Sequence, residues 1–206
     1  VIAKKPHPSY EKSVIGVIST FLFLANKGLM NVYFGDESGF SLQSNVPMCW
    51  QKKGTQIGIP SLRTRVMNVL GFLNPLNSHL VTYEIPKGEK MDSKTFIKFM
   101  SNFASKIILP TAVILDNASW HKSELTRAMF KEWESQGLYI VFLPPRSPHL
   151  NLIETLWRKI KNEWLAVADF RSEKAMREKI TYILKHYGEK YDIDFSMDKF
   201  KPKTNE

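Results

Sequence analysis

Three acidic residues lie in settings that suit a metal ligand. Asp36 follows the apolar run 32–35, Asp116 follows the apolar run 112–115, and Glu154 begins a helix-like stretch after a proline-rich turn. Carboxylates at strand ends and at a helix start can form a cage for hard divalent cations, which prefer oxygen ligands. If the three converge, the sequence predicts a two-metal site that cleaves phosphodiester bonds.

Each of these residues also has a purely structural explanation. Asp116 could cap a turn, and Glu154 would be stabilised by the dipole of its helix whatever its function. Glu37 is the alternative to Asp36, because neighbours on a strand point to opposite faces and only one of the two can face the site. The combination is more specific than any single residue.

Hydrophobic periodicity predicts the elements that must position these residues. A buried helix is expected over 14–25, with apolar residues at helical spacing, and Gly28 ends it. The β-branched and aromatic runs that follow predict strands: 29–37, 40–46 after a turn at Gly39, 65–73, and 80–85 after a turn at 74–77.

The second half of the chain alternates helices and strands. Ser93 is expected to cap a helix, whose buried face carries Phe96, Phe99, Met100, Phe103 and Ile107. The elements after it are expected at 111–115 (strand), 122–136 (helix), 139–143 (strand), 151–167 (helix) and 172–186 (helix), before a mobile polar tail, 199–206. A meander followed by crossover units predicts an α/β mixed sheet with helices on both faces. The strands of Asp36 and Asp116 would then be neighbours.

Composition limits the class of protein. Apolar residues make up 43% and aromatic residues 12%, enough for a real core, and the net charge of +9 favours a polyanionic partner such as nucleic acid. A soluble protein that is merely basic is the alternative. The single cysteine, Cys49, excludes an internal disulfide and a Cys-rich zinc site, and favours a reducing compartment. The apolar run 14–25 is shorter than the ~20 residues that span a bilayer, so no membrane partner is expected.

Three motifs together carry a resemblance to a known family. They are FGDESGF at 34–40, LDNASWHKS at 115–123 and LPPRSPHLNLIETLW at 143–157. These motifs resemble the catalytic motifs of DDE transposases, most closely those of the mariner-like superfamily and its bacterial insertion-sequence branch, over roughly residues 30–165. The resemblance implies a ribonuclease-H-like fold with a mixed five-stranded sheet, divalent-metal catalysis and cut-and-paste movement of a DNA element.

The resemblance also assigns the acidic residues. Asp36, Asp116 and Glu154 match the three catalytic positions and would hold two Mg²⁺ or Mn²⁺ ions, with Asp36 as the bridging ligand. His121 is a candidate for orienting a ligand or contacting the scissile phosphate, and a helix-start histidine bonded to backbone is an equal alternative. Asn117 is a second candidate, although this residue type is more often a turn residue than a ligand.

Two further positions bear on the match. Trp50 and Gly54 resemble a Trp-x-x-x-Gly element of the family. Arg146 and His149 depart from the residues usual in the family, which leaves the DNA contacts near the proline turn open.

Basic side chains near these motifs are candidates for binding the DNA backbone. They are Lys52, Lys53, Arg63, Arg65, Arg146, Arg158, Lys159 and Lys161. The last three share a helix with Leu156, Trp157, Ile160 and Trp164, which are expected to be core residues, and a solvated face is the alternative for these cations.

The predicted function is that of a transposase catalytic domain, which hydrolyses phosphodiester bonds at transposon ends and transfers strands into target DNA. Double-stranded DNA is the expected partner, and pairing of two ends implies a homodimer or larger complex. A non-catalytic, domesticated DNA-binding protein and another ribonuclease-H-like nuclease remain alternatives.

The expected organisation has three parts. Residues 1–28 would link to an upstream DNA-binding region, since the chain begins with Val. The catalytic domain would span 29–170, and 171–206 would form a C-terminal helix and tail. The expected location is the bacterial cytoplasm, at the nucleoid, or the nucleus of a eukaryote.

Overall fold

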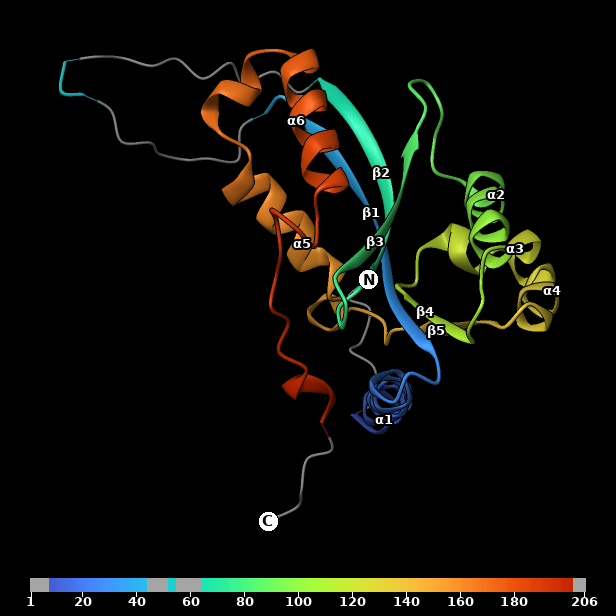
Figure 1. Ribbon diagram of the computed structural model, residues 1–206. Coiled ribbons are helices and arrows are strands. Elements are labelled where there is room, and N and C mark those ends of the chain that lie inside the picture. The colour runs from blue at the N-terminus through green and yellow to red at the C-terminus, as the bar shows by residue number, and fades with distance from the viewer. Residues whose placement is uncertain (1–7, 44–51, 55–63, 202–206) are drawn as a thin grey trace.

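One mixed sheet of five strands forms the centre of the molecule, in the order β3-β2-β1-β4-β5 (Figure 1). The computed structural model describes residues 8–43, 52–54 and 64–201. The strands are β1 (Asn31–Ser41), β2 (Arg65–Asn74), β3 (His79–Ile85), β4 (Thr111–Leu115) and β5 (Leu138–Phe142). β1, β2 and β3 pair antiparallel, whereas β4 runs parallel to β1 and to β5.

Helices cover both faces of this sheet (Figure 1). The α-helices are α1 (Pro8–Asn26), α2 (Ser93–Ala104), α3 (Glu124–Ala128), α4 (Phe130–Ser135), α5 (Ile153–Lys159) and α6 (Glu173–Lys185). Short helical turns are η1 (Ser119–Lys122), η2 (Pro148–Leu150), the π-helical η3 (Ile160–Trp164), η4 (Val167–Arg171) and η5 (Asp198–Phe200). The mixed sheet between helical layers confirms the predicted fold class.

Alternation along β1 divides the core in two. Phe34 is buried with side chains of α1, α5 and α6, while its neighbour Tyr33 is buried with side chains of α2 and α4 on the other face. The short strand β4 is buried along its whole length, as expected for a central parallel strand. Each strand residue therefore has a defined face, which decides where Asp36 points.

The predicted neighbourhood of the first strand and β4 is confirmed. Phe34 pairs with Ile114 in the parallel ladder. Asp36 and Asp116 each follow their ladder residue by two positions, so both lie at the same end of this strand pair. β2 and β3, with the turn between them, also lie where the sequence predicted them.

The predicted turn at Gly39 is wrong. β1 continues through Gly39, which pairs with Asn68, and ends at Ser41 after a bulge. Asp36 therefore lies within a strand and not at its end, because β2 continues the ladder beyond the point where β4 stops. The second strand expected at 40–46 does not form at residues 40–43, and the rest of that range lies outside the described residues.

Several predicted helix limits are also corrected. The helix expected at 122–136 is divided into η1, α3 and α4, because Ser123 accepts a hydrogen bond from the Thr126 amide and starts a new helix there. The helix expected at 151–167 is α5 and a π-helical turn. Asp92, and not Ser93, caps α2.

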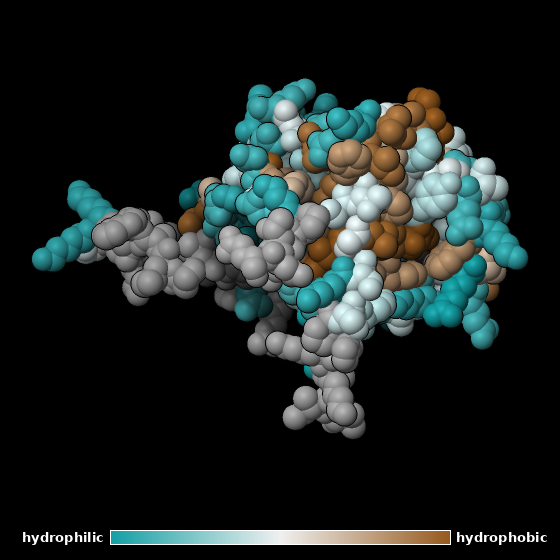
Figure 2. Space-filling view, turned by 90° about the horizontal axis from the view of Figure 1, so that it is seen from below, coloured by the Kyte–Doolittle hydropathy of each residue, from teal (hydrophilic) through white to brown (hydrophobic). Residues whose placement is uncertain are grey.

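The first helix is amphipathic and not fully buried. Val14 and Ile18 face the core, whereas the side chains of Val17 and Phe23 are 44% and 61% exposed. Figure 2 views the face on which α1 lies and shows hydrophobic side chains gathered on it. Within the described part of the chain, no helix has the length and apolar character needed to cross a membrane.

The C-terminal tail is packed where the structure describes it. Residues 199–201 were expected to be mobile, but Phe200 is buried, and its ring lies 5.7 Å from that of Phe34. The remainder of the predicted tail, 202–206, lies outside the described residues.

Candidate active site

Asp36 lies in β1 on the same face as Phe34, toward α5, because both have the same parity along the strand. Glu37 points to the opposite face. Burial raises the pKa of Glu37, and nearby Arg65 and His121 oppose the rise only in part. The alternation thus separates the two carboxylates that the sequence left as alternatives. Asp36 is the one that faces the helix carrying Glu154.

A glycine lets α5 come close to the sheet beside Asp36. Gly71 of β2 is the cross-strand partner of Asp36. A Cβ atom added at Gly71 would lie 2.8 Å from the ring of Trp157, which is shorter than a real contact. Because Trp157 packs into this space, Glu154, one helical turn before it, is brought to the sheet at the level of Asp36.

Asn151 ties the start of this helix to β1. Its Nδ2 donates a hydrogen bond of 3.1 Å to the carbonyl of Gly35, and its side chain is buried. The bond fixes the backbone directly before Asp36 relative to the turn that leads to Glu154. Sequence reasoning did not assign a role to Asn151. The only signal was a polar side chain inside the motif, three residues before the acid.

Asp116 follows β4 and is held by two donors. Its Oδ1 accepts hydrogen bonds from Nδ1 of His121 at 2.9 Å and from the Ala118 amide at 3.0 Å. Both of these donors contact Oδ1 and not Oδ2, and the side chain is 49% exposed. This arrangement fixes the carboxylate and leaves one oxygen for a ligand.

His121 is itself fixed by aromatic packing. It is 3% exposed, and its ring lies 4.5 Å from that of Phe96 and 6.0 Å from that of Trp120. Its Nε2 is buried and meets no hydrogen-bond partner among the described residues. The proton is therefore assigned to Nδ1, which donates to Asp116.

The three carboxylates differ in their electrostatics. Burial, together with the negative charges of Asp116 and Glu154, raises the pKa of Asp36 to about 7, although a backbone hydrogen bond from Glu37 opposes the rise. Burial and the charge of Asp116 raise the pKa of Glu154, opposed by Lys199. Burial would raise the pKa of Asp116 too, but the hydrogen bonds from His121 and Ala118 outweigh it and lower that pKa.

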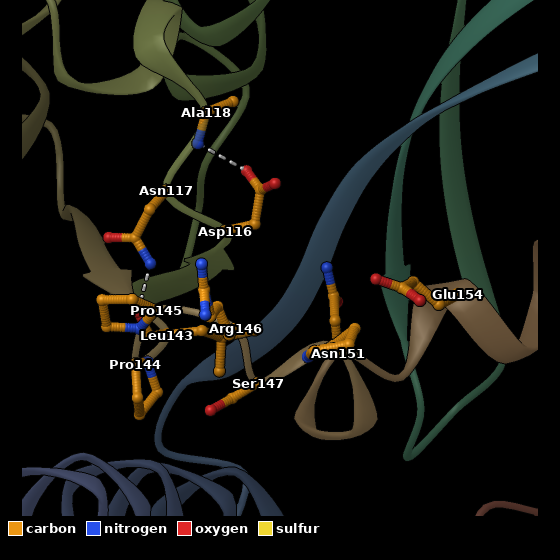
Figure 3. A pocket seen from close by; sticks show the side chains of 11 residues that line it. Asp116, Asn117, Ala118, Leu143, Pro144, Pro145, Arg146, Ser147, Asn151 and Glu154 are labelled. Atoms are coloured by element: carbon orange, nitrogen blue, oxygen red, sulfur yellow. Dashed lines mark hydrogen bonds between the residues drawn. The ribbon is translucent and has the colours of Figure 1, made fainter. Parts of the chain in front are cut away.

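A pocket of about 310 Å³ connects Asp116 with Glu154. It is walled by the proline turn, and Arg146, Ser147 and Asn151 contribute to its lining. Figure 3 shows Asp116 and Glu154 on opposite sides of this pocket. Among residues 8–43, 52–54 and 64–201, no three His, Cys, Asp or Glu side chains stand close enough together to hold one metal ion as they are.

Asn117 supports the wall of the pocket. Its Nδ2 donates to the carbonyl of Leu143 at 2.6 Å, and its Oδ1 accepts from Nζ of Lys122. Lys122 also lies over the ring of Phe142, 4.5 Å from its centre. Asn117 thus joins the end of β4 to the proline turn.

The predicted DNA-binding cations are dispersed. Arg146 lines the pocket in a left-handed conformation (φ 60°), and Lys161 is close enough to Asp36 and Arg65 for their charges to affect its pKa, which burial lowers. Lys159 forms an ion pair with Glu163 at 2.5 Å, and Arg158 is exposed on α5.

The remaining candidates lie in the connection between β1 and β2. Lys52, Lys53 and Gly54 are exposed. Trp50, Arg63 and Cys49 lie outside the described residues.

Comparison with known proteins identifies the family of this chain. Residues 31–177, more than half of the chain, match the family described as DDE superfamily endonuclease. The chain belongs to this DDE endonuclease family. The resemblance that the motifs predicted is therefore confirmed, and the matched range contains Asp36, Asp116 and Glu154.

Solved structures similar to this DDE endonuclease include several of the Mos1 transposase. The strand transfer complex of Mos1 has a TM-score of 0.56 at 12% identity, with 91% of this chain and 59% of that chain covered. The Mos1 mariner paired end complex with Mn has a TM-score of 0.54 at 14% identity, covering 90% and 58%. The Mos1 transposase catalytic domain with raltegravir and Mg has a TM-score of 0.53 at 13% identity, with 95% of this chain and 90% of that chain covered. These likenesses show the ribonuclease-H-like fold.

A sequence relative is the uncharacterized protein y4pE/y4sA of Sinorhizobium fredii (strain NBRC 101917 / NGR234). It is 34% identical over 59 residues, which are 29% of this chain and 39% of that protein. The DDE endonuclease thus spans well under two thirds of this relative's length.

Proposed function

We propose that this DDE endonuclease is the catalytic domain of a mariner-like transposase, which hydrolyses phosphodiester bonds at transposon ends and transfers the freed strands into target DNA. The observation that carries the proposal is the common location of the carboxylates. Asp36 and Asp116 each lie two residues beyond the last pair of the ladder between β1 and β4, and the charges of Asp116 and Glu154 both act on Asp36.

A divalent cation is the expected cofactor. The donor set fits Mg²⁺ or Mn²⁺, because carboxylate oxygens are their preferred protein ligands and because the charges of Asp116 and Glu154 help to raise the pKa of the largely buried Asp36 to about 7. Mn and Mg accompany Mos1 in its solved structures. Among the described residues no three such side chains stand close enough to hold an ion, so the carboxylates would have to draw together when the ions bind.

Each residue would then have a defined part. Asp36, Asp116 and Glu154 would hold two ions, with Asp36 between them, and the ions would supply the positive charge that the phosphate and the attacking oxygen need. His121 would keep Asp116 in the orientation that leaves Oδ2 for the cation. Arg146 and Lys161 would contact the DNA backbone near the site.

The wider setting follows from the chemistry of transposition. Double-stranded DNA would be the partner, and two copies of the chain would pair two transposon ends. The complex would work at the nucleoid of a bacterium or in the nucleus of a eukaryote.

A cleavage assay tests the proposal. The protein is incubated with Mg²⁺ or Mn²⁺ and labelled DNA duplex, and in parallel with an RNA–DNA hybrid. We expect cleavage of the duplex by the wild type and none by Asp116→Asn, with DNA binding retained in both. Cleavage of the hybrid alone would indicate a different ribonuclease-H-like nuclease. DNA binding without any cleavage would indicate a non-catalytic DNA-binding protein.

A further inference from the structure

The C-terminal segment returns to the turn that precedes Glu154. The family match ends at residue 177, and α6 continues to Lys185, after which the chain runs back along the α5 side of the molecule (Figure 1). Its last described element, η5, is anchored by Phe200, which is 2% exposed and contacts the buried ring of Phe34. Phe34 lies two residues before Asp36. The anchor therefore holds η5 close to the carboxylates.

Lys199, the neighbour of Phe200 in η5, contacts the turn η2. Its Nζ donates a hydrogen bond to the backbone carbonyl of His149, the middle residue of η2. The side chain is half-buried, and burial lowers the pKa of Lys199 while the charge of Glu154 raises it. A hydrogen bond from a charged ammonium group is stronger than one between neutral groups, and the same charge attracts the Glu154 carboxylate. Lys199 therefore acts on both the turn and the acid that follows it.

The turn leads directly into the catalytic helix. The Asn151 amide donates to the carbonyl of Pro148 at 2.8 Å, and the Glu154 amide donates to the carbonyl of Asn151 at 3.3 Å. α1 also contacts this turn, because Oε1 of Glu11 lies 3.7 Å from Nε2 of His149. Displacement of His149 would thus be transmitted through two hydrogen bonds to Glu154.

We propose that Lys199 is a positioning residue for Glu154, so that the C-terminal segment, outside the family match, completes the active site. Lys199 holds the carbonyl of His149 and thereby fixes the turn from which α5 starts. The role assigned to Glu154 rests on the proposed function, but the mechanical coupling of Lys199 to the turn does not. Two measurements therefore separate the two claims.

Hydrogen exchange tests the coupling in protein free of metal and DNA. In Lys199→Met, which keeps the apolar stem but removes the donor, we expect the amides of Leu150, Asn151 and Glu154 to exchange about tenfold faster. Lys199→Arg keeps charge and donors and should exchange like the wild type. Lys201→Met is the matched control, since Lys201 pairs with Asp198 at 2.6 Å in the same segment and is mostly exposed. Thermal melts confirm that each variant is folded.

Steady-state cleavage tests the consequence. Lys199→Met should lower kcat about tenfold with the KM for DNA unchanged within about twofold, and Lys199→Arg should restore kcat. Unchanged hydrogen exchange at the turn in Lys199→Met overturns the proposal, whatever the activity. A raised KM with unchanged kcat overturns it as well, because Lys199 would then be a DNA contact. Absence of cleavage in every variant contradicts the proposed function and leaves the exchange result to decide the coupling.

Discussion

Asp36 and Asp116 are chemically identical residues whose surroundings push their pKa values in opposite directions. Asp36 is buried beside two like charges and has a pKa of about 7, whereas the hydrogen bonds from His121 and Ala118 lower the pKa of Asp116. One carboxylate thus gains most from an added cation, and the other is already ionised and oriented. The sequence showed two acids after apolar runs and could not show this difference.

Removing the charge of Asp36 should stabilise the metal-free protein at high pH. Its pKa is raised from 3.8 in the unfolded chain to about 7 in the fold, so the folded state binds more protons between these values and the free energy of unfolding falls as pH rises through them. Asp36→Asn has no carboxylate to titrate at this position, so its free energy of unfolding should not show this fall. We expect its advantage over wild type to grow by about 2–3 kcal/mol from pH 5 to pH 8. Urea unfolding in excess EDTA measures it, and parallel pH profiles would contradict the assignment.

His121 should affect metal binding through Nδ1, which donates to Asp116. His121→Phe keeps the ring against Phe96 and removes the Nδ1 donor to Asp116, so we expect Mn²⁺ affinity to fall about 10- to 100-fold. His121→Asn keeps a donor near the position of Nδ1 and should bind Mn²⁺ nearly as well as wild type.

Titration calorimetry with Mn²⁺ distinguishes these variants. The matched control is His186→Phe, because His186 also bonds through Nδ1 and stacks on an aromatic ring, Tyr182, but belongs to the end of α6. Equal Mn²⁺ affinity of wild type and His121→Phe would show that His121 only fills space.

At the level of elements, periodicity predicted most of the fold. β4, β5 and α6 were predicted nearly to the residue because each is a short, uniform pattern bounded by clear turn or cap residues. β1 was not, because Gly39 has the composition of a turn and only its pairing with β2 keeps the strand extended. The pairing with β2 therefore determines the length of β1, although the local sequence at Gly39 favours a turn.

The site was predictable only in part for the same reason. The motifs identified the acidic residues, but the contacts that position them join residues far apart in the sequence. Asn151 reaches Gly35, and Trp157 fills the space left by Gly71. No local pattern in a single sequence reveals such pairs.

The contact between Gly71 and Trp157 gives a prediction at this level. Gly71→Ala forces the indole ring away, so we expect a loss of about 1–3 kcal/mol in stability and a reduced rate of cleavage as α5 moves outward. Gly16→Ala on α1 is the control, since a Cβ there meets nothing within 4 Å. Chemical denaturation and the duplex assay measure both effects. Wild-type stability of Gly71→Ala would contradict the proposed packing of α5.

For the whole molecule, the net charge of +9 predicts DNA binding through the phosphate backbone. We expect the 206-residue chain to bind unrelated duplexes with similar affinity, and the affinity to fall steeply between about 50 and 200 mM salt. Fluorescence anisotropy with several duplex sequences measures this. Tight, salt-insensitive binding to one sequence would contradict it.

The central claim is that Asp36, Asp116 and Glu154 form one metal site. Anomalous diffraction from crystals soaked in Mn²⁺ tests it most directly. We predict manganese peaks bound by Asp36 and Asp116, with Glu154 turned toward them and Oδ1 of Asp116 still bonded to His121. A peak bound by Glu37 on the opposite face, or no peak near these carboxylates at saturating Mn²⁺, would contradict the claim.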